Sequence, residues 1–390
     1  MLQQLINHSP DIEKLVNKGY SVNYIDGYLV VEHIPYVTSN KIVKWGALVA
    51  PLNLNPNFTV LPPSDHVIKF IGDFPCNENG DPISSIQHGN GEQLTSEFKI
   101  DFSFSNKPSQ GLCTYYDKFV HYIGIISSPA RYIDDNAKPN LGRAIQIIST
   151  QANNNFNYVD TNSTRASISN HNDRFSNLKI AIIGLGGTGS YLLDFISKTN
   201  VKEIHLYDKD IFSSHNAFRT PGAPDIIDLN GEVLKSDYLY RIYSKMHAGL
   251  INHKTYVNPN NLNELLDYDF VFVSIDNGKS RSLIVKYLLS KDIPFVDVGI
   301  GIDIKGDSLA ISARVSVNED PTVSLDRTED ALIDDDIYKT NIQIAEINAL
   351  NACMAIIKWK QYYEFYSSND KNIKSSDFIG EPFKIFSHEE

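Results

Sequence analysis

The sequence has few cysteines, no excess of basic charge and no long apolar run. Its three cysteines, Cys76, Cys113 and Cys353, are far apart and odd in number, which excludes a disulfide framework and a CxxC zinc site. The 47 acidic and 35 basic residues give a net charge of −12, which argues against nucleic acid as a partner. No apolar run reaches the roughly 18 to 20 residues of a membrane span, and the start, MLQQLINHSPDIEKL, lacks the layout of a signal peptide. We therefore expect a cytoplasmic protein that does not enter a membrane.

The length of 390 residues allows two domains, because single cores rarely exceed about 250 to 300 residues. Residues 1–150 contain short β-type runs separated by turn residues, which predicts a β-rich α+β module. Residues 151–177 are rich in Asn, Ser and Thr, and we interpret them as a linker. Residues 178–367 alternate apolar runs with helical spacing, which predicts an α/β domain with a doubly wound, mostly parallel Rossmann-like sheet. We interpret residues 368–390 as a polar tail.

A glycine-rich loop follows the first apolar run of the second domain, in IAIIGLGGTGS. Gly184, Gly186 and Gly189 satisfy G-x-G-x-x-G between an expected strand and an expected helix. Asp208 ends the next expected strand, where a carboxylate can accept hydrogen bonds from ribose hydroxyls. Taken alone, these features favour a dinucleotide such as NAD.

A second set of polar side chains is not expected of a dehydrogenase. In chain order, these are Asp210, Asn216, Arg219, Lys235, Asp276, Asn277 and Arg281. A triphosphate travels with Mg²⁺ and needs hard oxygen ligands and more than one cation. Asp276 can supply the oxygen ligand, and Arg219 with Lys235 can supply the cations. This set favours ATP over NAD.

In these elements the chain resembles the ThiF/MoeB family, which includes the core of the ubiquitin-activating enzymes. The family's pattern is a GxGGxGS loop, an aspartate-x-aspartate, an asparagine-x-x-arginine, a lysine on the next helix, and an aspartate-asparagine ahead of an arginine. The resemblance covers roughly residues 178–360. The matching residues are Gly184, Gly186, Gly187, Gly189, Ser190, Asp208, Asp210, Asn216, Arg219, Lys235, Asp276, Asn277 and Arg281.

The resemblance implies a role for each part of this set. Asp208 would hold the ribose, the glycine loop (Gly184 to Ser190) the backbone side of the nucleotide, Arg219 and Lys235 the phosphates, and Asp276 the Mg²⁺.

Many relatives are dimers in which the partner subunit contributes an arginine from an N-terminal segment. Arg165 is our candidate for that catalytic arginine, and Arg174 is the reserve. The resemblance therefore also implies a homodimer.

Family members attack the α-phosphate of ATP with the C-terminal carboxylate of a small β-grasp protein, which gives an acyl-adenylate and releases pyrophosphate. Positioning and charge neutralisation suffice for this chemistry, so we assign no catalytic histidine. We interpret His205 and His215, which lie near the expected site, as ordinary strand and loop residues.

The chain departs from its relatives in its cysteines. Many MoeB-like relatives carry zinc-binding CxxC pairs, which are absent here, and no cysteine lies between Asp303 and Thr340, where ubiquitin-activating enzymes carry theirs. Cys353 lies on an expected helix with an apolar stripe, and we interpret it as a small core residue. A thioester on this protein would need Cys76 or Cys113. The favoured alternative is direct transfer of the adenylate to a thiol on another protein.

The front module, with GYLVVEHIPYV, HVIKFIGDFPC and FSFSNKP, resembles the module fused to ThiF cores in bacterial operons. Those operons encode ubiquitin-like proteins, conjugating-enzyme-like proteins and JAB-type peptidases, and are associated with conjugation and antiviral defence. The implied partners are a ubiquitin-like protein and a conjugating-enzyme-like protein. Three alternatives stay open: an enzyme that adenylates a short peptide, an NAD-dependent oxidoreductase and a silent nucleotide-binding scaffold.

Several polar residues share the expected helix near the C-terminus. They can clamp a loop or a partner backbone, because buried amides need partners, and a plain exposed polar face explains most of them equally well. These residues are Asn341, Gln343, Glu346, Asn348 and Asn351.

Overall fold

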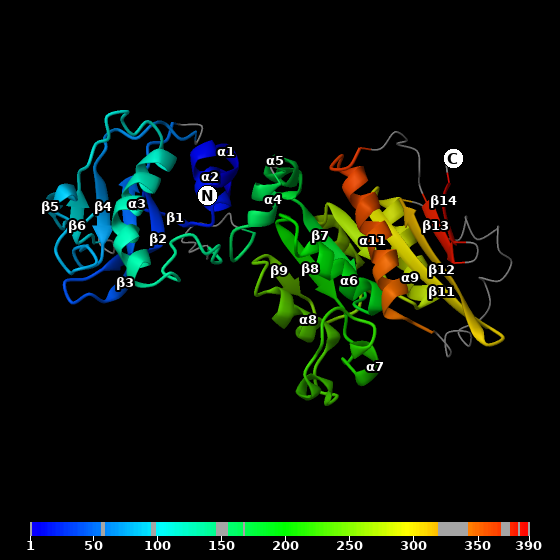
Figure 1. The fold of residues 1–390 in the computed structure, drawn as a ribbon. Helices are drawn as coiled ribbons and strands as arrows, with labels where there is room; N and C mark the ends of the chain where they lie inside the picture. Colours follow the sequence, from blue (N-terminus) through cyan, green and yellow to red (C-terminus); the bar gives the residue numbers. More distant parts are fainter. Residues whose placement is uncertain are drawn as a thin grey trace. The chain divides into compact units, whose positions relative to one another are not determined.

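The computed structural model describes residues 2–55, 59–94, 99–145, 155–166, 168–318, 342–367, 375–380 and 383–388. The chain divides into two compact units, Met1–Asn170 and His171–Glu390 (Figure 1). Asn341, one of the polar residues assigned to the C-terminal helix, lies outside the described residues. Among the described helices, none has the length and hydrophobicity to span a membrane.

The first unit contains a six-stranded antiparallel sheet in the order β1-β2-β3-β4-β6-β5. Alternate residues of its strands face α3, so that Val31, Leu48 and Phe70 form one core with Phe119 and Ile126 of the helix. The elements are α1 (Leu2–His8), α2 (Pro10–Asn17), β1 (Ser21–Ile25), β2 (Tyr28–Val37), β3 (Val43–Pro51), β4 (Ile68–Ile71), η1 (Ser84–Ile86), β5 (Gln87–Asn90), β6 (Phe102–Phe104), α3 (Tyr115–Ile133) and α4 (Thr161–Arg165).

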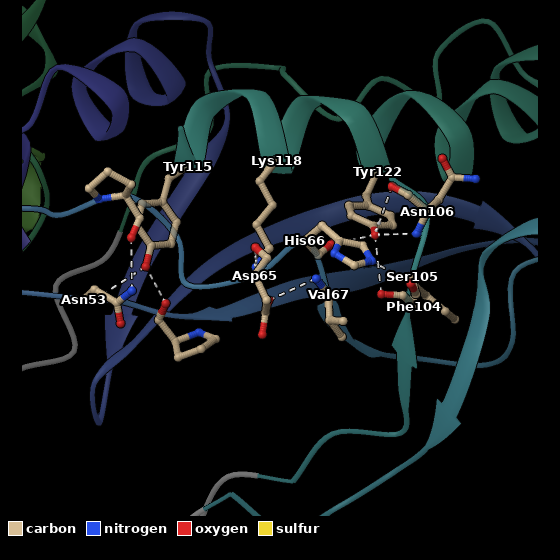
Figure 2. Close-up of polar contacts among 12 residues, drawn as sticks. Asn53, Asp65, His66, Val67, Phe104, Ser105, Asn106, Tyr115, Lys118 and Tyr122 are labelled. Carbon is tan, nitrogen blue, oxygen red and sulfur yellow. Dashed lines mark hydrogen bonds and ion pairs between the residues drawn. The ribbon is translucent and has the colours of Figure 1, made fainter. Parts of the chain in front are cut away.

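Two buried tyrosines attach α3 to the loops beside the sheet (Figure 2). The Tyr115 hydroxyl donates to the backbone oxygen of Pro51 at 2.6 Å. The Tyr122 hydroxyl donates to the backbone oxygen of His66 at 2.7 Å and accepts from the N–H of Asn106 at 2.8 Å. Because the two residues are seven apart, they lie on one face of the helix. The hydroxyls therefore bond to backbone at the end of β3 and in the loops that flank β4 and β6.

The second unit contains an eight-stranded sheet in the order β14-β13-β12-β11-β10-β7-β8-β9. The five strands from β11 to β9 are parallel, and β12, β13 and β14 extend the sheet with antiparallel pairs. The strands are β7 (Lys179–Ile183), β8 (Glu203–Tyr207), β9 (Leu250–Asn252), β10 (Phe270–Val273), β11 (Phe295–Lys305), β12 (Ser308–Val317), β13 (Ser375–Gly380) and β14 (Phe383–His388). The predicted Rossmann-like architecture is confirmed.

Helices cover both faces of this sheet. Ile180 and Ile182 of β7 pack in one core with α6, α8 and α11, and Ala181 and Ile183 pack in another core with α9. Because alternate residues of β7 face opposite helices, a continuous apolar run is required there. The helices and turns are α5 (Ser169–Asn172), η2 (Asp173–Phe175), α6 (Gly187–Ile196), α7 (Ser214–Ala217), η3 (Ile226–Leu229), α8 (Lys235–Tyr243), η4 (Leu262–Asp267), α9 (Gly278–Ser290) and α11 (Ala345–Tyr362).

Part of the stretch that we interpreted as a polar tail belongs to the sheet. Residues 375–380 and 383–388 form β13 and β14, and Phe378 pairs in register with Ala313 of β12. Phe378 is buried in the α11 face of the sheet, whereas its neighbour Ile379 is largely exposed. This alternation is short and embedded in polar sequence, so it does not stand out from the surrounding residues.

Candidate functional site

The candidate site lies at the edge of the sheet where the parallel strands end, called here the carboxyl edge. The chain passes from β7 to β8 on one side and later returns to β10 on the other side of β7. Such a reversal of strand order opens a crevice between the two neighbouring strands, and ligands of doubly wound sheets bind there. The glycine loop directly follows β7 and therefore lies at this crevice.

The four glycines of the loop differ in what a side chain at each position would contact. A Cβ on Gly184, whose φ is +88°, would lie 2.3 Å from the backbone oxygen of Ser274, and one on Gly189 would lie 1.9 Å from the backbone oxygen of Gly184. A Cβ on Gly187 would lie 2.4 Å from a side chain of α11. At Gly186, no described atom lies within 4 Å of the Cβ position. Packing therefore requires three of the glycines, and the fourth leaves its backbone open to a ligand.

The start of α6 offers main-chain donors at the same place. Gly186 is the N-cap residue and has no side chain with which to cap the helix. The Ser190 side chain, which we expected at the nucleotide, is fully buried and donates to the backbone oxygen of Gly187 at 2.7 Å. The first turn is therefore held by its own serine, and the helix N-terminus favours a negatively charged group.

Asp208 shapes the glycine loop from the end of β8. Its carboxylate accepts from the N–H of Leu185 at 2.7 Å and from the N–H of Asp210 at 2.8 Å. Burial raises the pKa of the Asp208 carboxyl, although the charge of Lys235 and the two N–H donors oppose this effect. The predicted ribose ligand is thus a buried carboxylate with a structural task as well.

Asp210 and Lys235 form an ion pair beside Asp208. The Lys235 Nζ lies 2.6 Å from the Asp210 carboxylate, and the Tyr256 hydroxyl donates to the same carboxylate. Burial alone would raise the pKa of Asp210, but the hydrogen bonds from Lys235 and Tyr256 hold it below its usual value. Sequence reasoning missed Tyr256. It follows β9, and the position after a third parallel strand was the signal that could have identified it.

Arg219 and Asp276 come from different elements, and their charges interact. Burial lowers the pKa of Arg219, and the charge of Asp276, which follows β10 and is exposed, raises it. Burial lowers the pKa of His215 too, and the charges of Arg219 and Lys235 lower it further. Arg219 therefore interacts electrostatically with Asp276, and both Arg219 and Lys235 act on His215.

Several buried polar atoms beside these charges have no hydrogen-bond partner within the described part of the chain. They are Asn216 Nδ2, Arg219 Nε, Thr220 Oγ1 and Ser236 Oγ. Asn216 uses its other amide atom to accept from the N–H of Ser213 at 2.9 Å. Buried polar groups are nearly always paired in proteins, so such a group of orphan atoms indicates a ligand or water site. Sequence reasoning did not include Thr220 or Ser236.

Other predicted residues lie elsewhere or have local tasks. Asn277 caps α9, because its side chain accepts from the N–H of Ser280 at 2.9 Å. Arg281 donates to the fully buried Asp297 at 2.6 Å. An aspartate inside the apolar strand run IPFVDVGIG was a signal for this pairing, because a buried carboxylate needs a cation or several donors.

The two candidate arginines belong to different units of the chain. Arg165 ends α4 in the first unit and stays a prediction. Arg174 donates to the backbone oxygen of Glu364 at 2.8 Å. Glu364 follows the C-terminal end of α11, whereas the N-terminal end of that helix packs on the glycine loop, and the reserve role of Arg174 in a partner's site stays a prediction.

The cysteines differ from the expectation at one position. Cys353 is exposed on α11, so its assignment to the core is wrong. Cys76 is buried, which raises the pKa of its thiol, and Cys113 is exposed two residues before α3. Of the two candidates in the front module, only Cys113 therefore lies open to solvent.

Comparison with known proteins matches each of the two parts of the chain to a protein family. Residues 161–371, more than half of the chain, match the ThiF family, and residues 10–161 match a domain of unknown function (DUF6791). The tRNA threonylcarbamoyladenosine dehydratase of Haemophilus influenzae is 27% identical over 130 residues, which cover 32% of this chain and 49% of the relative. The chain spans about half the length of the curated relatives it matches.

Similar solved structures include E. coli MccB with MccA-N7isoASN, at 18% identity and a TM-score of 0.45 over 59% of this chain and 69% of that chain. E. coli MccB with ATP is 18% identical with a TM-score of 0.42 over the same shares of the two chains.

Proposed function

This chain belongs to the ThiF family, and we propose that it is an Mg-ATP-dependent adenylyltransferase. In this proposal the enzyme activates the C-terminal carboxylate of a ubiquitin-like protein as an acyl-adenylate, which then passes to a thiol. The observation that supports it most is that the charge of Asp276 acts on Arg219, while the charges of Arg219 and Lys235 both act on His215.

The residues fit a metal-bound triphosphate. Gly186 leaves the backbone open where the N-terminus of α6 can receive phosphate oxygens, and Arg219 and Lys235 can neutralise them. Asp208 lies where the ribose is proposed to bind. Asp276 is an exposed carboxylate, and Mg²⁺ is commonly held by one or two carboxylates together with substrate phosphates.

The reaction then needs little acid–base chemistry. A carboxylate is ionised at neutral pH, so its oxygen can attack the α-phosphorus of ATP directly. The new bond joins that oxygen to phosphorus, and the bond to the bridging oxygen of the β-phosphate breaks, which releases pyrophosphate. Lys235 and Arg219 are placed to offset the charge of the phosphates, and charge stabilisation of this kind is often the largest catalytic term.

We also propose that the enzyme is a homodimer in which Arg165 of one subunit serves the site of the other. Three exposed apolar side chains in the segment between β8 and α8 support self-association, since exposed apolar residues are commonly buried at interfaces. They are Phe218, Ile226 and Ile227, with exposed fractions of 83%, 79% and 66%. A conjugating-enzyme-like protein is the proposed acceptor of the activated carboxylate, within a bacterial conjugation pathway that can serve antiviral defence.

ATP–pyrophosphate exchange tests the proposal, with a ubiquitin-like protein as the carboxylate donor. We expect exchange with the natural sequence and at least about a 100-fold loss in Asp276→Ala. Asp307→Ala, which removes an exposed carboxylate in the β11–β12 turn, is the matched control and should keep the exchange rate. Equal exchange in the two variants would exclude the proposed role of Asp276.

A tRNA-modifying activity is a second candidate, because a curated relative is named as a tRNA threonylcarbamoyladenosine dehydratase. The net charge of −12 opposes it, since tRNA binding is favoured by basic surfaces. The same assay separates the candidates when it is run in parallel with a ubiquitin-like protein, a short peptide and tRNA. Exchange with the short peptide alone would favour peptide adenylation. Bound NAD without any exchange would favour the oxidoreductase, which leaves Arg219, Lys235 and Asp276 without a shared task.

A further inference from the structure

Two buried amides on the first turns of α11 connect the helix to two different parts of the carboxyl edge. Asn348 and Asn351 are 1% and 0% exposed, and residues three apart are neighbours on a helix surface. Asn348 bonds to α6, next to the glycine loop, and Asn351 bonds to β11. These segments come from distant parts of the sequence, and α11 is their common contact.

Asn348 holds the first turn of α6. Its Oδ1 accepts from the Thr188 hydroxyl at 2.9 Å, and its Nδ2 donates to the backbone oxygen of Ile344 at 3.0 Å. The amide also fills the space beside Gly187, where a Cβ would lie 2.4 Å from it. Both ends of the amide are therefore fixed, and the start of α6 packs directly on it.

Asn351 holds β11 just past the point where β10 ends. The last residue of β11 paired with β10 is Asp297, and Asn351 Nδ2 donates to the backbone oxygen of Gly299 at 3.1 Å. A strand that continues beyond its neighbour has backbone groups without a ladder partner. The Asn351 amide supplies a donor to that backbone, so α11 fixes the direction in which β11 leaves the sheet.

We propose that Asn348 and Asn351 are positioning residues that hold the α6 N-terminus and the extension of β11 at a fixed separation. The proposal rests on the proposed function, in which α6 receives the phosphates of ATP and the carboxyl edge receives the substrate carboxylate. Neither amide needs to touch a substrate, because each acts through the backbone or hydroxyl group that it binds. Reacting groups need placement within about 0.5 Å, so loosening either bond is expected to reduce activity.

The two amides should affect different parameters. Asn348→Leu removes both hydrogen bonds at similar side-chain volume, and we expect the dissociation constant for Mg·ATP to rise about tenfold. Asn351→Leu should leave the dissociation constant for Mg·ATP within about twofold and instead lower kcat/KM for the polypeptide substrate about tenfold. Cys353→Ala, at an exposed position of the same helix, is the matched control. Thermal unfolding of each variant shows whether it remains folded.

A second pair of variants isolates the Thr188–Asn348 bond. Thr188→Val keeps the shape and removes the hydroxyl donor, so it should weaken Mg·ATP binding as Asn348→Leu does. Thr188→Ser restores the donor and should bind Mg·ATP at least about fivefold more tightly than Thr188→Val. The double variant, which combines Thr188→Val with Asn348→Leu, should bind Mg·ATP no more weakly than either single variant. Both changes remove the same hydrogen bond, so their effects should not add.

Calorimetric titration with Mg·ATP makes the outcome independent of turnover. Additive losses in the double variant, or equal affinities for Thr188→Val and Thr188→Ser, would overturn the positioning role of Asn348. An unchanged kcat/KM for the polypeptide substrate in folded Asn351→Leu would overturn that of Asn351. Absence of exchange in the natural protein would instead count against the proposed function, while the titration would still decide the role of Asn348.

Discussion

Each unit buries a lysine beside a half-exposed aspartate, and the two pairs differ in their surroundings. In the first unit, Lys118 is 1% exposed and its Nζ lies 3.2 Å from Asp65, which is 51% exposed (Figure 2). In the second, Lys235 is 10% exposed and lies 2.6 Å from Asp210, which is 47% exposed. Lys118 also donates to the backbone oxygen of Asp65, and the nearby tyrosine hydroxyls of α3 bond to the backbone oxygens of Pro51 and His66.

Lys235, by contrast, lies among charges and orphan polar atoms. Asp208 and His215 both respond to its charge, and the buried atoms without partners in the described residues include four between Asn216 and Ser236. In the first unit, Lys118 and the neighbouring tyrosines of α3 make their hydrogen bonds within the unit. In the second unit, the polar atoms of Asn216, Arg219, Thr220 and Ser236 that lack a partner within the described chain support the proposed site at the carboxyl edge.

The largest effect is expected from two alanine substitutions in the glycine loop. One replaces a glycine that packing requires, and the other replaces the glycine that leaves its backbone open to a ligand. Gly189→Ala places a Cβ against the backbone oxygen of Gly184 and should lower the free energy of unfolding by about 4 kcal/mol. Gly186→Ala meets no described atom, so its stability should stay within about 1 kcal/mol of the natural protein while Mg·ATP binding is lost. Urea unfolding and calorimetric titration measure the two quantities. Equal stabilities would contradict the distinction between the glycines.

The next largest difference is expected in ATP–pyrophosphate exchange when each of the two lysines is replaced by methionine. Lys235→Met should reduce ATP–pyrophosphate exchange by about 10² to 10³, because it removes a cation from the proposed phosphate site. Lys118→Met should leave exchange unchanged and alter stability by less than about 1 kcal/mol, because Asp65 remains half-exposed and hydrated. A loss of exchange in folded Lys118→Met would break the comparison.

The sequence predicts much of the second unit because its signals are local. The run LKIAIIG is buried on both faces in β7, as continuous apolar strands of parallel sheets are. Cys353 was misassigned because α11 is apolar on most sides, so its sequence does not show which face is exposed. Cys353 and Ile357, four residues apart, both lie on the exposed face.

The composition of the site was easier to predict than its internal bonds. The spacing of Asp208 from Asp210 indicates two carboxylates at one strand end, and both lie there. That Asp208 binds the N–H of Leu185, or that Thr188 bonds to Asn348, depends on how distant segments pack together. Side-chain periodicity carries no information about such contacts, which only the folded chain determines.

Acid should weaken the second unit through the buried side chain of His247. Its ring is fully buried, and burial lowers its pKa from 6.5 to about 4, although its bond with the backbone oxygen of Val201 opposes this. The unfolded chain binds a proton more readily, so stability is complete above pH 6.5 and falls as the pH drops towards 4. The difference corresponds to roughly 3 kcal/mol of unfolding free energy.

Urea unfolding between pH 4 and pH 7 measures this dependence. His247→Gln should flatten the part of the curve between pH 4 and pH 6.5, because the group that titrates there is gone. Lys118 in the first unit should not contribute in this range, since burial lowers its pKa from a value of 10.5 and it stays protonated in the unfolded chain at acid pH. An unchanged slope in His247→Gln would show that other groups cause the acid sensitivity.

The smallest effect is expected from Tyr122→Phe, which tests whether the polar contacts of α3 serve only the fold. The change removes the hydroxyl that donates to His66 and accepts from Asn106, and both partners are partly exposed, so water can replace it. The free energy of unfolding should fall by about 1 kcal/mol, the net value of an ordinary hydrogen bond. Exchange and Mg·ATP affinity should not change. A folded Tyr122→Phe protein that had lost exchange would mean that the helix face shown in Figure 2 is part of the function, and the contrast between a structural and a functional lysine pair would no longer hold.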